Sequence, residues 1–130
     1  GAANCLRPYD FAYKPLLEHF FTPLPTGLLF YTGEQFPERY RGGAFIAFHG
    51  SWNRAPLPQK GYQVMFVPFT DGKAGTPAVF ADKFGGADPV MDPRKAAYRP
   101  SGLAQARDGA IYVSDDTKGR IWRITYTGQK

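Results

Sequence analysis

The chain has 130 residues, of which 43% are hydrophobic and 21% charged, the size and balance of one globular domain rather than of a disordered segment. Its 15 Gly and 12 Pro residues, with 16% aromatic residues, disfavour helices and favour short strands joined by tight turns. No stretch approaches the roughly 18 apolar residues of a membrane helix, and the net charge of +5 is scattered rather than gathered into a basic stripe. We therefore expect an all-β protein with no membrane span and no nucleic-acid partner.

Residues 1–26 are expected to form an irregular lead-in segment, because four prolines interrupt it. The segment lacks the charged and apolar regions of a signal peptide and has no initiating Met, which predicts a mature, processed or truncated polypeptide. Cys5 is the single cysteine, so it cannot form an internal disulfide and is expected to be an ordinary thiol.

Residues 27–96 are predicted to form a first antiparallel unit. Apolar and alternating runs predict four strands, at Gly27–Thr32, Ala44–His49, Tyr62–Phe69 and Thr76–Ala81. Pro77 restricts the last of these to an edge or a strand end, because proline cannot donate to a ladder. Asp71-Gly72 is a hairpin turn before that strand. The sequence therefore predicts a four-stranded meander for this unit.

Residues 97–130 are predicted to form a second, three-stranded unit. The strands are expected at Gly102–Gln105, Ile111–Ser114 and Arg120–Tyr126, with turn residues between them. Two successive small meanders are typical of blades in a β-propeller. Because two blades cannot close a ring, we expect the chain to be the C-terminal part of a larger propeller, or to pair with a chain that supplies the remaining blades.

One polar segment, His49-Gly-Ser-Trp-Asn-Arg54, directly follows a predicted apolar strand. It combines an imidazole, an indole plane, an amide and a guanidinium, which suit a flat, anionic, hydrogen-bonding ligand. In the alternative interpretation, Trp52 packs on a neighbouring blade while Asn53 and Arg54 satisfy loop carbonyls.

A second candidate, Arg99, precedes the first strand of the second unit, where a propeller strand lines the central channel. Its structural alternative is a surface arginine whose stem covers Tyr98. Asp115 and Asp116 are adjacent carboxylates in a turn, and we favour that turn interpretation over metal binding. With one Cys and two His, a structural zinc site is improbable.

A family resemblance rests on the segments GLLFYTG (27–33), HGSWNR (49–54) and YRPSG (98–102), in this order within residues 27–126. This pattern resembles the C-terminal part of the pyrroloquinoline quinone (PQQ)-dependent sugar dehydrogenases, and within them the sorbosone and pyranose dehydrogenase-like branch. The resemblance implies a six-bladed β-propeller in which PQQ accepts a hydride from the anomeric carbon of an aldose or related aldehyde.

The resemblance also implies particular cofactor contacts. Asn53 and His49 match positions that reach PQQ from the loop after the strand, with Arg54 beside them, and Arg99 matches an arginine that pairs with a PQQ carboxylate. Thr22 falls near a minor contact. Ala97 departs from the soluble glucose dehydrogenases, which have a second arginine there, so their cofactor affinity and substrate preference cannot be transferred.

In such enzymes the general base and the calcium ligands belong to blades outside this segment, so this chain is expected to hold no catalytic residue and no metal ligand. The implied partners are a sugar substrate, the remaining blades and an electron acceptor, in a periplasmic or secreted setting. Two other interpretations stay open: a non-catalytic propeller module that binds a glycan or a protein, and a propeller hydrolase such as a lactonase, which we place last.

Overall fold

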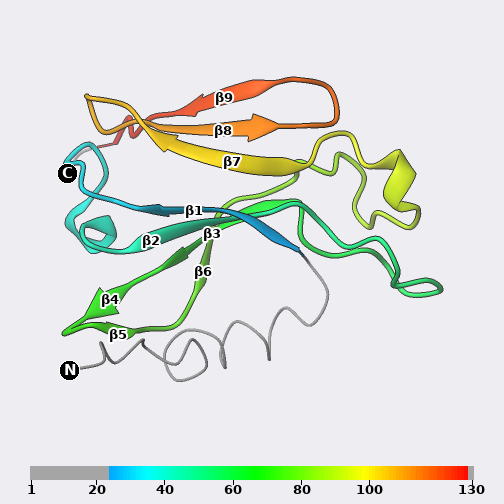
Figure 1. The fold of residues 1–130 in the computed structure, drawn as a ribbon, viewed down its shortest axis with the longest axis horizontal. Coiled ribbons are helices and arrows are strands. Elements are labelled where there is room, and N and C mark those ends of the chain that lie inside the picture. Colours follow the sequence, from blue (N-terminus) through cyan, green and yellow to red (C-terminus); the bar gives the residue numbers. More distant parts are fainter. Residues whose placement is uncertain (1–23, 129–130) are drawn as a thin grey trace, which may run out of the picture.

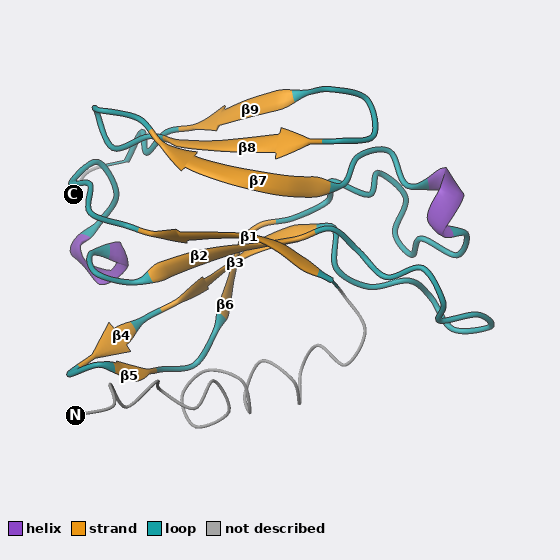
Figure 2. Cartoon of the chain, viewed as in Figure 1, coloured by secondary structure: helices purple, strands orange, loops and turns teal. Residues whose placement is uncertain are grey.

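The computed structural model describes residues 24–128 and is built from β-strands, with two single-turn 3-10 segments at Glu38–Tyr40 and Pro93–Lys95. Figures 1 and 2 show a four-stranded antiparallel sheet, a two-stranded ribbon and a three-stranded antiparallel sheet. The first sheet has the order β1-β2-β3-β6, the ribbon is β4-β5, and the second sheet is β7-β8-β9. Their bounds are β1 Pro25–Phe30, β2 Ala44–Phe48, β3 Gln63–Val67, β4 Phe69–Thr70, β5 Lys73–Ala74, β6 Ala78–Ala81, β7 Pro100–Gln105, β8 Ile111–Asp115 and β9 Ile121–Ile124. The predicted all-β fold is confirmed.

The first sheet is the predicted meander, with one correction in its third strand. Tyr62–Phe69 is not one strand: it divides at Pro68, which has no N–H for the ladder and instead accepts a hydrogen bond from the Gly75 N–H at 2.7 Å. The Asp71-Gly72 turn therefore closes the small β4-β5 ribbon, and β6 returns beyond it to pair with β3. Both turn residues have positive φ, as a tight hairpin requires. β6 is an edge strand, as Pro77 predicted.

The second sheet contains the three predicted strands, with β7 beginning at Pro100 and β9 limited to Ile121–Ile124. β7 pairs with β8 and β8 with β9, both antiparallel. Trp122, Ile124 and Tyr126 are half-buried and alternate with exposed residues, so one face of β9 contacts the core.

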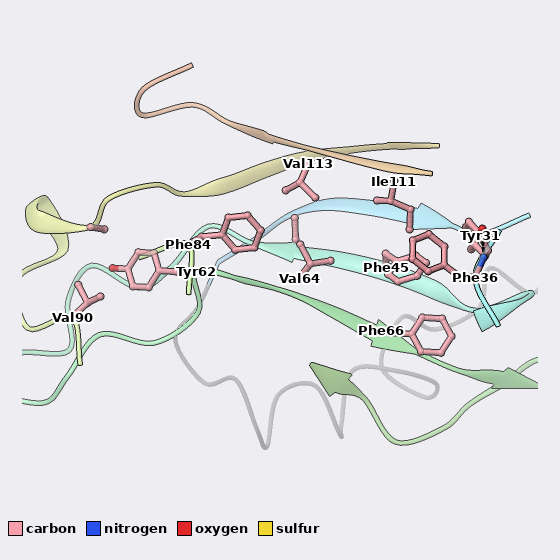
Figure 3. Close-up of a cluster of buried hydrophobic side chains, with 12 residues drawn as sticks. Tyr31, Phe36, Phe45, Tyr62, Val64, Phe66, Phe84, Val90, Ile111 and Val113 are labelled. Atoms are coloured by element: carbon pink, nitrogen blue, oxygen red, sulfur yellow. Dashed lines mark hydrogen bonds between the residues drawn. The ribbon is translucent and has the colours of Figure 1, made fainter. Parts of the chain in front are cut away.

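The two sheets pack face to face around a buried cluster rich in aromatic rings (Figure 3). Phe45 and Val64 contribute from the first sheet and Ile111 and Val113 from the second, and all four are fully buried. Rings meet mainly edge to face, as between Tyr31 and Phe45 at a centroid distance of 5.6 Å. This burial is the main stabilising contribution, because each large side chain removed from water stabilises the fold by about 1.5–3 kcal/mol.

Hydrogen bonds tie β1 to the second sheet at both of its ends. The Thr26 hydroxyl donates to the Pro100 carbonyl at 3.2 Å, and beyond the other end the Tyr31 hydroxyl donates to the Gly109 carbonyl at 2.8 Å. Between them, a Cβ added to Gly27 would lie 2.6 Å from the Ser101 carbonyl oxygen. β1 and β7 are thus in backbone contact where only glycine fits.

Two stacked meanders of this kind are consistent with neighbouring blades of a β-propeller. The closed ring, and the division of the chain at residues 26/27 and 96/97, stay predictions. The helices within residues 24–128 are too short to cross a bilayer.

We predict that Gly27→Ala destabilises the protein by about 2–3 kcal/mol, because the new methyl group meets a backbone carbonyl that cannot rotate away. Urea denaturation gives the free energy of unfolding. Gly42→Ala is the control: Gly42 has open space but a φ of +71°, so its cost is the conformational penalty of about 1 kcal/mol. Equal losses in the two variants would contradict a steric constraint between β1 and β7.

Candidate functional site

The predicted site residues of the described chain gather at one end of the two sheets. His49 directly follows β2 and Arg99 directly precedes β7, and antiparallel pairing with stacking brings these strand ends together (Figure 1). The Arg99 Nη1 donates to the His49 carbonyl at 3.5 Å. Asn53 and Arg54 lie on the loop after His49, whereas Thr22 lies outside the described residues.

The His49 imidazole is paired with a residue that the sequence assigned only to a turn. Its Nε2 lies 2.9 and 3.0 Å from the two carboxylate oxygens of Asp116, which directly follows β8. The carboxylate favours a hydrogen on Nε2, so in the neutral ring Nδ1 is an acceptor. This hydrogen bond joins the two sheets, and the imidazole remains 22% exposed, which leaves it accessible to a ligand.

The Arg99 guanidinium is held by neutral groups. Its Nη2 donates to the Pro93 carbonyl at 2.6 Å, and its central carbon lies 5.3 Å from the centroid of the Tyr62 ring. No carboxylate among residues 24–128 lies within ion-pair distance of Arg99, so its charge is not neutralised there.

The Arg99 guanidinium lies over Tyr62, whereas the charged groups over the Tyr98 ring are those of Arg120 and Lys118, 4.7 and 5.2 Å from its centroid. The structural alternative, an Arg99 stem covering Tyr98, stays an alternative. Arg99 is turned toward Tyr62 and the first sheet because its backbone N–H is fixed by the Asp115 carboxylate at 2.6 Å.

Asp115 is a buried positioning residue, 5% exposed. Its two oxygens accept from the backbone N–H groups of Arg99 and Lys118, each at 2.6 Å. Burial is the largest single effect and acts to raise the pKa of Asp115, but the backbone N–H hydrogen bonds together hold that pKa below its ordinary value of 3.8. Asp115 therefore stabilises the turn after β8 and the backbone before β7.

Tyr62 stabilises the loop after His49 through its ring and its hydroxyl group. Burial raises the pKa of its phenol above the ordinary 10.0, an effect that the neighbouring Arg99 guanidinium only partly offsets, so Tyr62 is neutral at physiological pH. Its hydroxyl donates to the Ser51 carbonyl at 3.0 Å, and its ring lies where a Cβ on Gly50 would be, at 2.2 Å. With a φ of +104° as well, position 50 requires glycine.

The loop after His49 is closed by its own hydrogen bonds. The Ser51 hydroxyl accepts from the Lys60 N–H at 2.9 Å and donates to the Gln59 Oε1 at 2.8 Å. The Arg54 Nε donates to the Pro58 carbonyl at 2.8 Å, which confirms the interpretation that Arg54 satisfies a loop carbonyl. Trp52 is 73% exposed, so its ring packs on neither sheet of residues 24–128, and its packing on a further blade stays an alternative.

Residues 24–128 contain no group of three His, Cys, Asp or Glu side chains that could hold a metal ion. An open polar hollow of about 470 Å³ lies at the other end of the sheets, lined by residues that include Thr32, Gln105 and Asp108. None of the predicted site residues lines it.

Fold and site together define an all-β protein of stacked meanders with a cationic, donor-rich site where two sheets meet at their strand ends. The chain belongs to the TrAA12-like family, whose profile matches residues 3–127. This membership supports the predicted relationship to the sugar dehydrogenase family in general. The assignment to the sorbosone branch stays a prediction.

Individual relatives are longer than this chain. It is 33% identical over 103 residues to an uncharacterized protein of Borreliella burgdorferi, covering 78% of this chain and 26% of that protein. It is 34% identical over 94 residues to a pyrroloquinoline quinone-dependent pyranose dehydrogenase of Coprinopsis cinerea, covering 62% of this chain and 13% of that enzyme. A solved structure of a Trichoderma reesei carbohydrate-active enzyme of family AA12 aligns with a TM-score of 0.44 and 27% identity, over 61% of this chain and 20% of that one. The chain thus spans about a quarter or less of their lengths.

We predict that Asp115→Asn lowers the free energy of unfolding by about 2–3 kcal/mol at neutral pH, because an amide cannot accept from both the Arg99 and Lys118 N–H groups. The folded-state pKa of Asp115 is depressed, so its stabilisation is present above the ordinary value of 3.8 and is lost as pH falls through the lower folded value. Below pH 4, the free energy of unfolding should therefore decrease less steeply with falling pH in the variant than in the wild type. Denaturation at a series of pH values measures this.

Asp116→Asn is the matched control for this prediction, since Asp116 is exposed and pairs only with His49 among the described residues. It should cost less than about 1 kcal/mol. A loss as large as that of Asp115→Asn would contradict the assignment of Asp115 as the positioning carboxylate.

Proposed function

We propose that this chain forms part of the cofactor-binding face of a PQQ-dependent oxidoreductase that oxidises a sugar at its anomeric carbon. The observation that carries the proposal is the Arg99 guanidinium, held beside His49 with no carboxylate among the described residues to neutralise it. The pyranose dehydrogenase named among the relatives uses the same cofactor, and the family membership supports a link to sugar oxidation.

The residues present fit PQQ by the chemistry of their donors. PQQ is a planar tricarboxylate with an ortho-quinone, so it needs cations, N–H donors and flat surfaces. Arg99 has five N–H donors, and its Nη1 and Nη2 each give one to a neutral carbonyl, so further donors remain for a carboxylate. Asn53 is exposed, and the buried Gln59 amide nitrogen has no hydrogen-bond partner among residues 24–128.

Arg99 would hold a PQQ carboxylate by charge-assisted hydrogen bonds, which Asp115 makes possible by fixing the Arg99 backbone. Asn53, with an amide that both donates and accepts, would hold a second oxygen, and His49 would contact the cofactor beside it with a ring oriented by Asp116. When bound, PQQ would supply the acceptor for the substrate's hydride, which carries both electrons of the oxidation. Arg54 acts indirectly, by bracing the loop that carries Asn53.

In this proposal the general base and the calcium ligands come from other segments of a six-bladed ring, and a separate acceptor removes the electrons. The periplasmic or secreted location is part of the same proposal. The sugar itself is an aldose or a related aldehyde.

We predict that Arg99→Lys weakens PQQ binding roughly ten- to hundredfold, because one ammonium cannot reproduce the guanidinium fork at a carboxylate. Titration of the apoprotein in its longest natural form with PQQ, followed by cofactor absorbance, gives the affinity. Sugar-dependent reduction of an artificial dye, with PQQ and calcium added, gives the activity and should fall in parallel.

Arg123→Gln is the matched control, because Arg123 pairs with Asp108 near the opposite end of the second sheet. It should leave PQQ affinity unchanged. If Arg99→Lys and Asn53→Ala also bound PQQ like the wild type, the cofactor proposal would fail and the non-catalytic binding module would be favoured. Absence of any sugar-dependent dye reduction would refute the enzyme itself.

A further inference from the structure

We propose that Trp52 is a sugar-stacking residue at the solvent side of the site, and that its indole face binds a neutral pyranose ring. The inference rests on the proposed function, because it places a substrate subsite beside the cofactor residue Asn53. It concerns a different ligand and can be tested apart from PQQ binding.

The described residues leave Trp52 largely uncovered. Its side chain is more exposed than those of Ile121 and Leu28, with 73% against 67% and 62%. The other tryptophan, Trp122, packs edge to face against Phe84 and Tyr98 at centroid distances of 4.9 and 5.0 Å. An indole this exposed contributes little to stability, so its use is expected in binding.

The backbone that carries Trp52 is fixed on both sides. Ser51 is fully buried, its N–H donates to the Lys60 carbonyl at 2.8 Å, and its carbonyl accepts from Tyr62. After Trp52, the Arg54 carbonyl accepts from the Leu57 N–H at 2.8 Å. The Gln59 N–H donates to the Val90 carbonyl at 2.7 Å, which ties the loop to the segment before β7. A ring presented from a fixed base loses less conformational freedom on binding.

The chemistry of the segment selects a neutral ring over the acidic cofactor. A pyranose has an apolar C–H face, which packs on an indole, and a rim of hydroxyls, which the adjacent Asn53 amide can both donate to and accept from. The carboxylates of PQQ need cations, and in the proposed cofactor site that cation is Arg99, which is half-buried against Tyr62, while the Arg54 Nε is bonded to the Pro58 carbonyl.

Fluorescence tests the proposal directly, since the signal of Trp52 is the difference between the intact protein and its Trp52→Phe variant. Apoprotein without PQQ is titrated with D-glucose and D-galactose, and with mannitol as an acyclic control that lacks the rigid apolar face. We expect a saturable change with at least one pyranose, none with mannitol, and the same response in the matched control Trp122→Phe.

Kinetics provide an independent measurement in the PQQ-loaded enzyme. Trp52→Ala should raise the KM for the sugar about tenfold with little change in kcat, whereas Trp52→Phe should recover part of the loss, and both should bind PQQ like the wild type. An unchanged KM, or a Trp52 signal that responds to PQQ but to no sugar, overturns the proposal. A Trp52 signal that is blue-shifted and unresponsive also overturns it, because another part of the enzyme then covers the ring. None of these outcomes changes the Arg99 test of the cofactor site.

Discussion

The close approach of β1 and β7 is the constraint on which the candidate site depends. Gly27 has no side chain, so the two strands come near enough for the Thr26 hydroxyl to bond the Pro100 carbonyl. That separation fixes how the strand ends of both sheets meet. His49, at the end of β2, then lies within reach of Asp116, at the end of β8. A wider spacing would preserve each sheet by itself and lose every polar bond between them at this end.

The distribution of charge follows from the same geometry. Asp115 and Arg99 are neighbours, yet they do not form an ion pair. The carboxylate is occupied by backbone N–H groups, which satisfy it without a cation, while the guanidinium is occupied by carbonyls, which do not neutralise it. The site therefore keeps the positive charge of Arg99, because the Asp115 carboxylate in the turn after β8 does not neutralise it.

The sequence predicted most of the strands because strand and turn signals are local. Pro68 was the exception: its effect on the third strand depends on a ladder that only the paired structure defines. The His49–Asp116 pair spans 67 residues and was missed. One signal could have found it, since each residue directly follows the second strand of its unit and stacked units bring equivalent positions together. The orientation of Arg99 could not be found this way, because it depends on which ring, Tyr62 or Tyr98, is already covered by other cations.

The segment after His49 also shows why composition alone left its role open. Ser51 and Trp52 are adjacent, yet one is fully buried and the other 73% exposed. The serine is inside because the loop needs its hydroxyl and backbone to close against Gln59 and Lys60. With these polar groups engaged in the loop, the exposed Trp52 and Asn53 need form no contact for the fold to hold. Hydrogen bonding within the loop thus accounts for the buried serine, while the fold of the described residues makes no use of the adjacent indole and amide.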